Sequence, residues 1–141
     1  MRIKVMTVVT GAILTIISGS MTAQNSAYES DTTWKVPESA AAIQNPLAER
    51  PETAKGGKKL FLRNCAECHG KDGSGILKKH SANFRLAAVQ AQSDGSLFWK
   101  ITNGNPDRGM PSFSKLPGAQ RWQLVLYLRT LQGAPTAVKP D

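Results

Sequence analysis

The pattern of apolar positions along the chain predicts helices joined by polar loops. The clearest helix covers Gln120 to Leu131, whose broad apolar face is formed by Trp122, Leu124, Val125, Leu126, Leu128 and Leu131. A second covers about Ala54 to Cys65, with Leu60, Phe61 and Cys65 on one face at helical spacing. A shorter one, Leu97 to Thr102, can be capped by Ser93-Asp94-Gly95 and ended by Asn103-Gly104. No stretch resembles a strand of any length, which predicts an all-α domain.

The start of the 141-residue chain has the pattern of an export signal. Arg2 and Lys4 precede an apolar run from Val5 to Ile17, and small residues follow up to Ala23. The run is shorter than the roughly 20 residues of a membrane span. We therefore expect residues 1–23 to be a signal peptide, a periplasmic or otherwise exported product, and no stable membrane insertion after cleavage. Retention of the signal as an anchor stays open.

Composition divides the rest of the chain into three segments. Residues 24–53 contain Pro37, Pro46 and Pro51 and predict an irregular N-terminal extension laid over the domain, with Trp34 as its candidate anchor. Residues 54–132 carry the helices and form the predicted domain. Residues 133–141 are expected to be a loose C-terminal tail.

The sequence Cys65-Ala66-Glu67-Cys68-His69 is a C-x-x-C-H motif, which is the attachment site of a c-type haem. The two thiols lie within one helical turn, so each can form a thioether to one porphyrin vinyl group, and His69 then lies under the iron. A zinc site would require Cys65, Cys68, His69 and His80 together, although two of these are adjacent in the chain. A redox dithiol lacks its βαβ context, and a disulfide would leave His69 unexplained.

Met110 is the candidate for the second axial ligand of the iron. The chain's other methionines, Met1, Met6 and Met21, all lie within the predicted signal. Gly109 and Pro111 flank Met110, which favours a turn over a core helix. His80, in a polar loop, is the rival ligand, and an open sixth position with peroxide chemistry is the third alternative.

The formal charge of the chain is +8, and basic residues crowd around the motif. They are Lys55, Lys58, Lys59, Arg63, Lys71, Lys78, Lys79 and Arg85. Most of these side chains are expected to be solvated surface. They could also form a basic ring that attracts the acidic docking surface of a redox protein. Nucleic-acid binding does not suit an exported haem protein.

Over about residues 53–132 the chain resembles a class I monohaem c-type cytochrome of bacteria. Gly57 and Phe61 precede Cys65 at the spacing at which that family crosses its first and last helices, and Leu124 and Tyr127 fit the partner positions. The Gly109-Met110-Pro111 loop follows a short helix and precedes the last helix, which is the order found in the family. The stretch from Leu97 to Gly104 resembles the helix that precedes this loop in bacterial relatives.

The resemblance implies a cytochrome c fold, with three to five helices wrapped around one haem c. It implies Cys65 and Cys68 as thioether anchors, and His69 and Met110 as axial ligands. Trp99 or Arg85 could approach a haem propionate. The implied function is single-electron transfer between redox partners, without enzymatic activity. The alternative is an electron-accepting cytochrome subunit of a periplasmic dehydrogenase complex, and a peroxidase or gas sensor is the third hypothesis.

Overall fold

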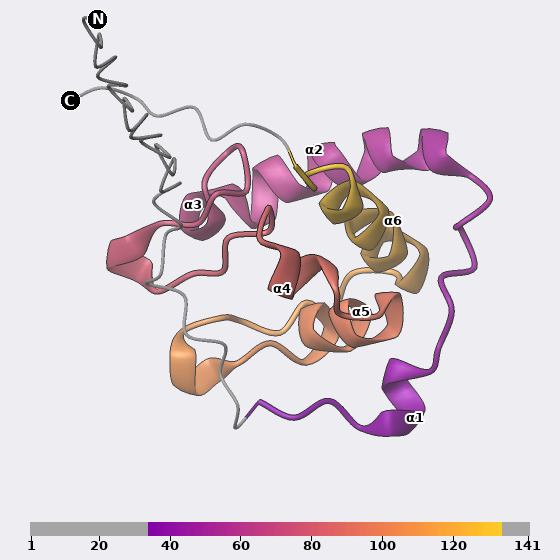
Figure 1. Ribbon diagram of the computed structural model, residues 1–141, viewed down its shortest axis with the longest axis horizontal. Helices are drawn as coiled ribbons and strands as arrows, with labels where there is room; N and C mark the ends of the chain where they lie inside the picture. The colour runs from indigo at the N-terminus through magenta and orange to yellow at the C-terminus, as the bar shows by residue number, and fades with distance from the viewer. Residues whose placement is uncertain (1–33, 134–141) are drawn as a thin grey trace, which may run out of the picture.

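The computed structural model describes residues 34–133, which are helical apart from turns and loops (Figure 1). The α-helices are α1 (Glu38–Ala41), α2 (Ala54–Asn64), α3 (Ala66–His69), α4 (Ala87–Gln90), α5 (Asp94–Asn103) and α6 (Gly118–Arg129). Three 3₁₀ turns join them: η1 (Pro51–Thr53), η2 (Leu77–Lys79) and η3 (Pro106–Arg108). Within this range, β pairing is limited to one isolated bridge between Asn105 and Met110.

The all-α fold is confirmed, but the described residues contain six α-helices where three to five were expected. Helices α1, α3 and α4 have four residues each, too short for an apolar period to show in the sequence. The three longer helices match the predicted ones. Helix α5 starts at Asp94 rather than Leu97, because Ser93 is its N-cap and accepts a hydrogen bond from the Ser96 backbone N–H at 3.1 Å.

The centre of the fold is the contact between α2 and α6, whose ribbons cross in Figure 1. Gly57 lies at the crossing, where a Cβ atom would overlap the Gln123 backbone carbonyl and would lie 2.9 Å from the Tyr127 Cβ. The absence of a side chain therefore allows the two helices to approach closely. Around the crossing lie the most deeply buried large side chains, Phe61, Leu124 and Val125.

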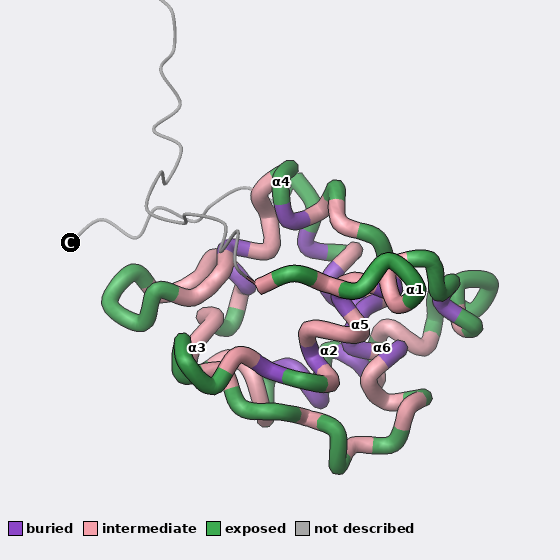
Figure 2. Tube along the Cα trace, turned by 90° about the horizontal axis from the view of Figure 1, so that it is seen from below, coloured by how far each residue is buried: buried purple, intermediate pink, exposed green. Residues whose placement is uncertain are grey.

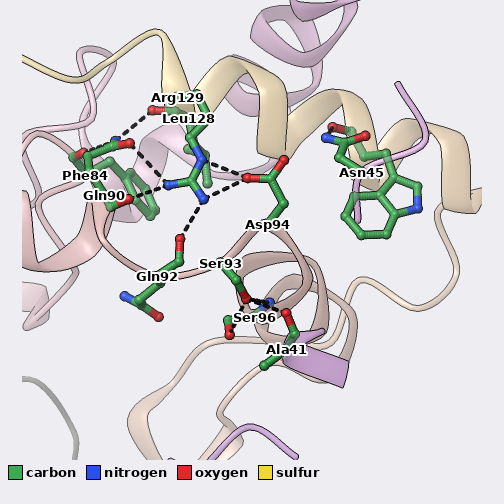
Figure 3. Close-up of polar contacts among 11 residues, drawn as sticks. Ala41, Asn45, Phe84, Gln90, Gln92, Ser93, Asp94, Ser96, Leu128 and Arg129 are labelled. Atoms are coloured by element: carbon green, nitrogen blue, oxygen red, sulfur yellow. Dashed lines mark hydrogen bonds and ion pairs between the residues drawn. The ribbon is translucent and has the colours of Figure 1, made fainter. Parts of the chain in front are cut away.

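Arg129, the last residue of α6, ties that helix to the connection between α4 and α5 (Figure 3). Its guanidinium donates to the backbone carbonyls of Gln90 and Gln92 at 2.7 and 2.6 Å. It also pairs with the Asp94 carboxylate at 2.7 Å. Because one planar group with several donors binds acceptors on three residues, the end of α4 and the start of α5 are fixed relative to α6.

Residues 34–50 run along α5 and α6 before the chain enters α2 (Figure 1). Most of them are exposed, as the view of this side in Figure 2 shows, but Asn45 is buried and Leu47 packs against the core. The predicted signal at 1–23 and residues 134–141 of the predicted tail lie outside the described residues. Among the helices of residues 34–133, none has the length and apolar character needed to cross a membrane.

Substituting the two neighbouring glycines of α2 tests the crossing. Gly57→Ala should lower the free energy of unfolding by about 1–3 kcal/mol, since its methyl group would overlap the α6 backbone. Gly56→Ala is the matched control: its Cβ would meet only the flexible end of the Gln123 side chain, at 2.9 Å. This variant should be neutral or slightly stabilised by its better helix propensity. Urea denaturation of the haem-loaded proteins measures both, and equal losses would contradict the close approach.

Candidate functional site

One pocket brings together all four residues predicted to hold a haem. Cys65, Cys68, His69 and Met110 line it, and the rival ligand His80 also contributes. The pocket contains about 1020 Å³ of space, counting the part open to solvent.

The C-x-x-C-H motif spans the junction between α2 and α3. Cys65 follows the last residue of α2 and is the N-cap of α3, while Cys68 and His69 lie in α3. Neither cysteine is in a disulfide. Burial, with a smaller contribution from Cys68, raises the pKa of the Cys65 thiol to about 12. The environment therefore disfavours a thiolate and suits an uncharged sulfur, such as that of a thioether.

His69 is oriented by a single backbone hydrogen bond. Its Nδ1 lies 3.1 Å from the backbone carbonyl oxygen of Ala82. A carbonyl can only accept, so Nδ1 carries the proton and Nε2 keeps its lone pair. Burial lowers the pKa of His69 despite this hydrogen bond, which favours the neutral imidazole needed for metal coordination. The Phe84 ring packs beside it, with centroids 4.6 Å apart.

The loop after the motif is folded so that the Ala82 carbonyl faces His69. Ser81 Oγ donates to the Cys68 carbonyl and accepts from the Ile76 backbone N–H at 2.8 Å. Further along, Asp72 accepts from the Ser74 hydroxyl at 2.8 Å and pairs with Arg85 at 3.1 Å. Burial by itself raises the pKa of Asp72, but the hydrogen bonds from Ser74 and the charge of Arg85 outweigh it and hold this pKa below its usual value.

Met110 closes a tight hairpin loop that begins at Asn105. The Asn105 N–H donates to the Met110 carbonyl at 2.8 Å, and the Met110 N–H donates back at 2.9 Å. The turn between them is η3, and Gly109 takes the left-handed conformation, with φ of 77°. In Figure 1 this loop lies well apart from α3, so Met110 and His69 reach the pocket from separate parts of the fold.

The remaining wall of the pocket is mostly apolar, as the flat face of a porphyrin requires. It is formed by Phe61, Phe84, Ile101, Phe113, Leu124 and Leu128, among others. The donor set and the apolar wall together fit a haem. An apolar wall of this kind limits solvent access and so influences the redox potential and ligand access of a bound iron.

The edges of the pocket include residues that the sequence did not indicate. Arg85 and Trp99, considered as propionate contacts, are not among the lining residues. Lining residues that had not been predicted include Phe84, the backbone of Ala82, and Trp34. A backbone acceptor leaves no signature in residue types, so only the fold could reveal Ala82. Trp34 had been expected to pin the extension, and its place in the pocket gives it a second role.

Comparison with known proteins agrees with this geometry. The family model described as "Cytochrome C oxidase, cbb3-type, subunit III" matches residues 52–128. The chain belongs to this family of c-type cytochrome domains. A solved structure described as KustC0563 c-type cytochrome is 32% identical, with a TM-score of 0.50, over 54% of this chain and 96% of that one. No curated protein matches the chain.

The chain is therefore a monohaem c-type cytochrome that binds haem c covalently and transfers electrons to and from redox partners. It is an electron carrier rather than an enzyme. The match to the family model runs from η1 into the last turn of α6, and this segment contains the whole C-x-x-C-H motif and the Met110 loop.

The low pKa of Asp72 predicts a pH-dependent contribution to stability. The folded-state pKa lies below the unfolded one, so the carboxylate stabilises the fold at neutral pH. That contribution is lost as pH falls from about 4 through the folded-state pKa. Asp72→Asn should lower the free energy of unfolding by about 1 kcal/mol at pH 7, since the carboxylate is partly exposed.

Urea denaturation of the wild type and Asp72→Asn across this pH range measures the difference, which should shrink in acid. Glu49→Gln, the same kind of change at an exposed position, serves as the control and should show no such trend. A constant difference between wild type and Asp72→Asn at all pH values would refute the role given to the ionised carboxylate.

Proposed function

We propose that this cytochrome is exported and carries single electrons through a haem iron ligated by His69 and Met110, with Cys65 and Cys68 as its thioether anchors. The observation that supports this most directly is the state of His69. Its Nδ1–H is engaged by Ala82, so Nε2 is available as a ligand inside the pocket that Met110 also lines. Ligation by a thioether and an imidazole would favour the ferrous state of the bound haem and raise its potential.

The haem supplies the electron transfer itself, and the residues of the chain hold it in a fixed environment. His69 is oriented by Ala82, and the paired backbone hydrogen bonds of the loop from Asn105 hold Met110. Because both ligand-bearing segments are braced in this way, both ligands stay in place through a redox cycle. Little structural rearrangement then accompanies each transfer.

Export agrees with covalent haem attachment, which in bacteria takes place outside the cytoplasm. Residues 1–23 are the proposed signal, and the periplasm is the proposed compartment. A second candidate function is that of an electron-transferring subunit in a larger oxidoreductase. From the sequence, this alternative is expected to be the electron-accepting subunit of a dehydrogenase complex. The family description favours it, because it names a subunit of an oxidase. In that case the chain would be isolated together with partner subunits.

The turn η2 is the proposed docking surface for an acidic partner. Leu77 is one of the most exposed large apolar side chains, at 58%, and is followed by the exposed Lys78 and Lys79. Lys79 Nζ lies 3.8 Å from the Cys68 sulfur and 3.0 Å from Glu67, so this surface adjoins one of the proposed thioether sites. An exposed apolar side chain followed by two lysines suits brief, electrostatically steered encounters.

Substitution of the two candidate ligands tests the ligation. Met110→Ala should abolish the weak far-red band of thioether-ligated ferric haem and lower the midpoint potential. Because minor states are typically populated to about 0.1–10%, opening the sixth position permanently should raise the apparent carbon monoxide affinity about 10- to 1000-fold. Absorption spectra and redox titration measure these changes. His80→Ala is the control and should leave them unchanged; the reverse pattern would identify His80 as the ligand.

Charge reversal at the docking surface should alter electron exchange with small charged reagents. Lys78→Glu should slow oxidation of the ferrous protein by the anionic oxidant ferricyanide several-fold at low ionic strength, and the effect should fade as salt is added. Stopped-flow absorbance measures the rate. Lys55→Glu, at the other end of α2 from Cys65, serves as the matched control. An equal slowing in both variants would mean that only net charge matters and that η2 is not the entry surface.

A further inference from the structure

Residues 34–50, here called the strap, lie outside the part of the chain that matches the family model. We propose that the strap is a cover of the haem pocket, held so that Trp34 forms part of the wall and restricts the access of water and small ligands to the iron. In this proposal Trp34 acts on the electron-transfer centre as part of the pocket wall and takes no part in ligation. The inference rests on the proposed function, because it assigns the pocket to a haem.

The first attachment of the strap is to the start of α5. Gly95 packs so closely against the strap that a Cβ there would overlap the Ala40 carbonyl oxygen. The same Cβ would lie 2.7 Å from the Ile43 carbonyl oxygen. Ser93 Oγ adds a hydrogen bond to the Ala41 carbonyl at 2.7 Å (Figure 3). Close backbone packing and a hydrogen bond together fix α1 on α5.

The second attachment is to α6, through Asn45, which Figure 3 shows beside that helix. Asn45 is only 6% exposed, although it is polar. Its side-chain amide donates to the Trp122 backbone carbonyl at 3.4 Å and accepts from the Leu47 N–H at 2.9 Å. A buried amide with both ends engaged specifies one position for the chain around it.

The third attachment places Trp34 at the pocket. The ammonium of Lys100, on α5, lies 4.8 Å from the centroid of the Trp34 ring, a cation–π contact. Gln92 accepts a hydrogen bond from the same ammonium at 2.8 Å, which orients it. Trp34 lines the same pocket as His69 and Met110. The strap thus brings an aromatic ring from outside the family region to the proposed metal centre.

A wall of this kind has two consequences for the iron. Excluding water disfavours the more highly charged ferric state, so the strap should raise the potential. It also places an aromatic ring between solvent and part of the pocket, so ligand entry from that side requires the strap to open. Most of the strap is solvent-exposed, which makes local opening without global unfolding possible.

The test uses the full-length, haem-loaded protein, with imidazole as the probe of the ferric iron. Trp34→Ala should bind imidazole several-fold faster than the wild type and have a lower midpoint potential, while Trp34→Phe, which keeps an aromatic ring, should stay close to the wild type. Lys100→Met should accelerate binding about two- to fivefold, the factor expected for loss of an exposed cation–π contact. Lys115→Met removes one positive charge at an exposed position outside the pocket lining and is its control.

A change far from the pocket separates the strap from a direct effect of Trp34. Gly95→Ala should also accelerate imidazole binding, since its methyl group displaces the strap while favouring helix α5 itself. Gly118→Ala is the matched control at the start of α6, where the nearest contact of a Cβ would be 3.9 Å away. Faster imidazole binding in Trp34→Ala and Gly95→Ala, with Lys115→Met and Gly118→Ala at the wild-type rate, supports the proposal that the strap covers the pocket.

Wild-type rates of imidazole binding in both Trp34→Ala and Gly95→Ala would overturn the proposal that the strap covers the pocket. The far-red band of the wild type reports separately on the proposed ligation. If the band is present and the variants are unchanged, only the strap inference fails. If the band is absent, the Met110 ligation fails, and the rates of the variants relative to wild type still decide whether the strap limits access.

Discussion

The close approach of α2 and α6 at Gly57 is the contact on which the rest of the structure depends. It buries Phe61 and Leu124, and both side chains also line the haem pocket. Because Cys65 directly follows α2, the position of that helix against α6 sets the position of the whole C-x-x-C-H motif. The helix crossing therefore supports the core and the site at once, and displacement of α2 would move the haem anchors relative to the opposite wall.

The two proposed axial ligands are held in different ways, and the difference follows from their surroundings. His69 lies in a helix of four residues, which is too short to be stable alone and depends on the loop that presents the Ala82 carbonyl. Met110 lies in no helix and is held by backbone pairing with Asn105. In both cases the backbone of a loop positions the ligand, while the long helices supply the apolar wall.

The predictable part of this protein is the part encoded in local patterns. The helices now seen as α2, α5 and α6 were predicted from apolar periodicity, capping residues and glycine, with errors of a few residues at their ends. The C-x-x-C-H motif specified its chemistry through spacing alone. The expectation that Met110 would share a site with His69 came from flanking glycine and proline together with family resemblance, and the two residues do line one pocket.

The remainder could not be predicted, because it depends on contacts between distant residues. Helices α1, α3 and α4 are single turns whose stability comes from tertiary packing rather than from their own sequences. The hydrogen bond from Asn45 to the Trp122 carbonyl joins residues 77 positions apart, and neither residue type indicates the pairing. The position of Trp34 could not be predicted for the same reason. Its size suggested an anchor, but only the course of the strap past Gly95 determines that the anchor lies at the haem pocket. A domain whose family core contains both proposed ligands thus has, in a short preceding segment, a proposed further wall around the same site.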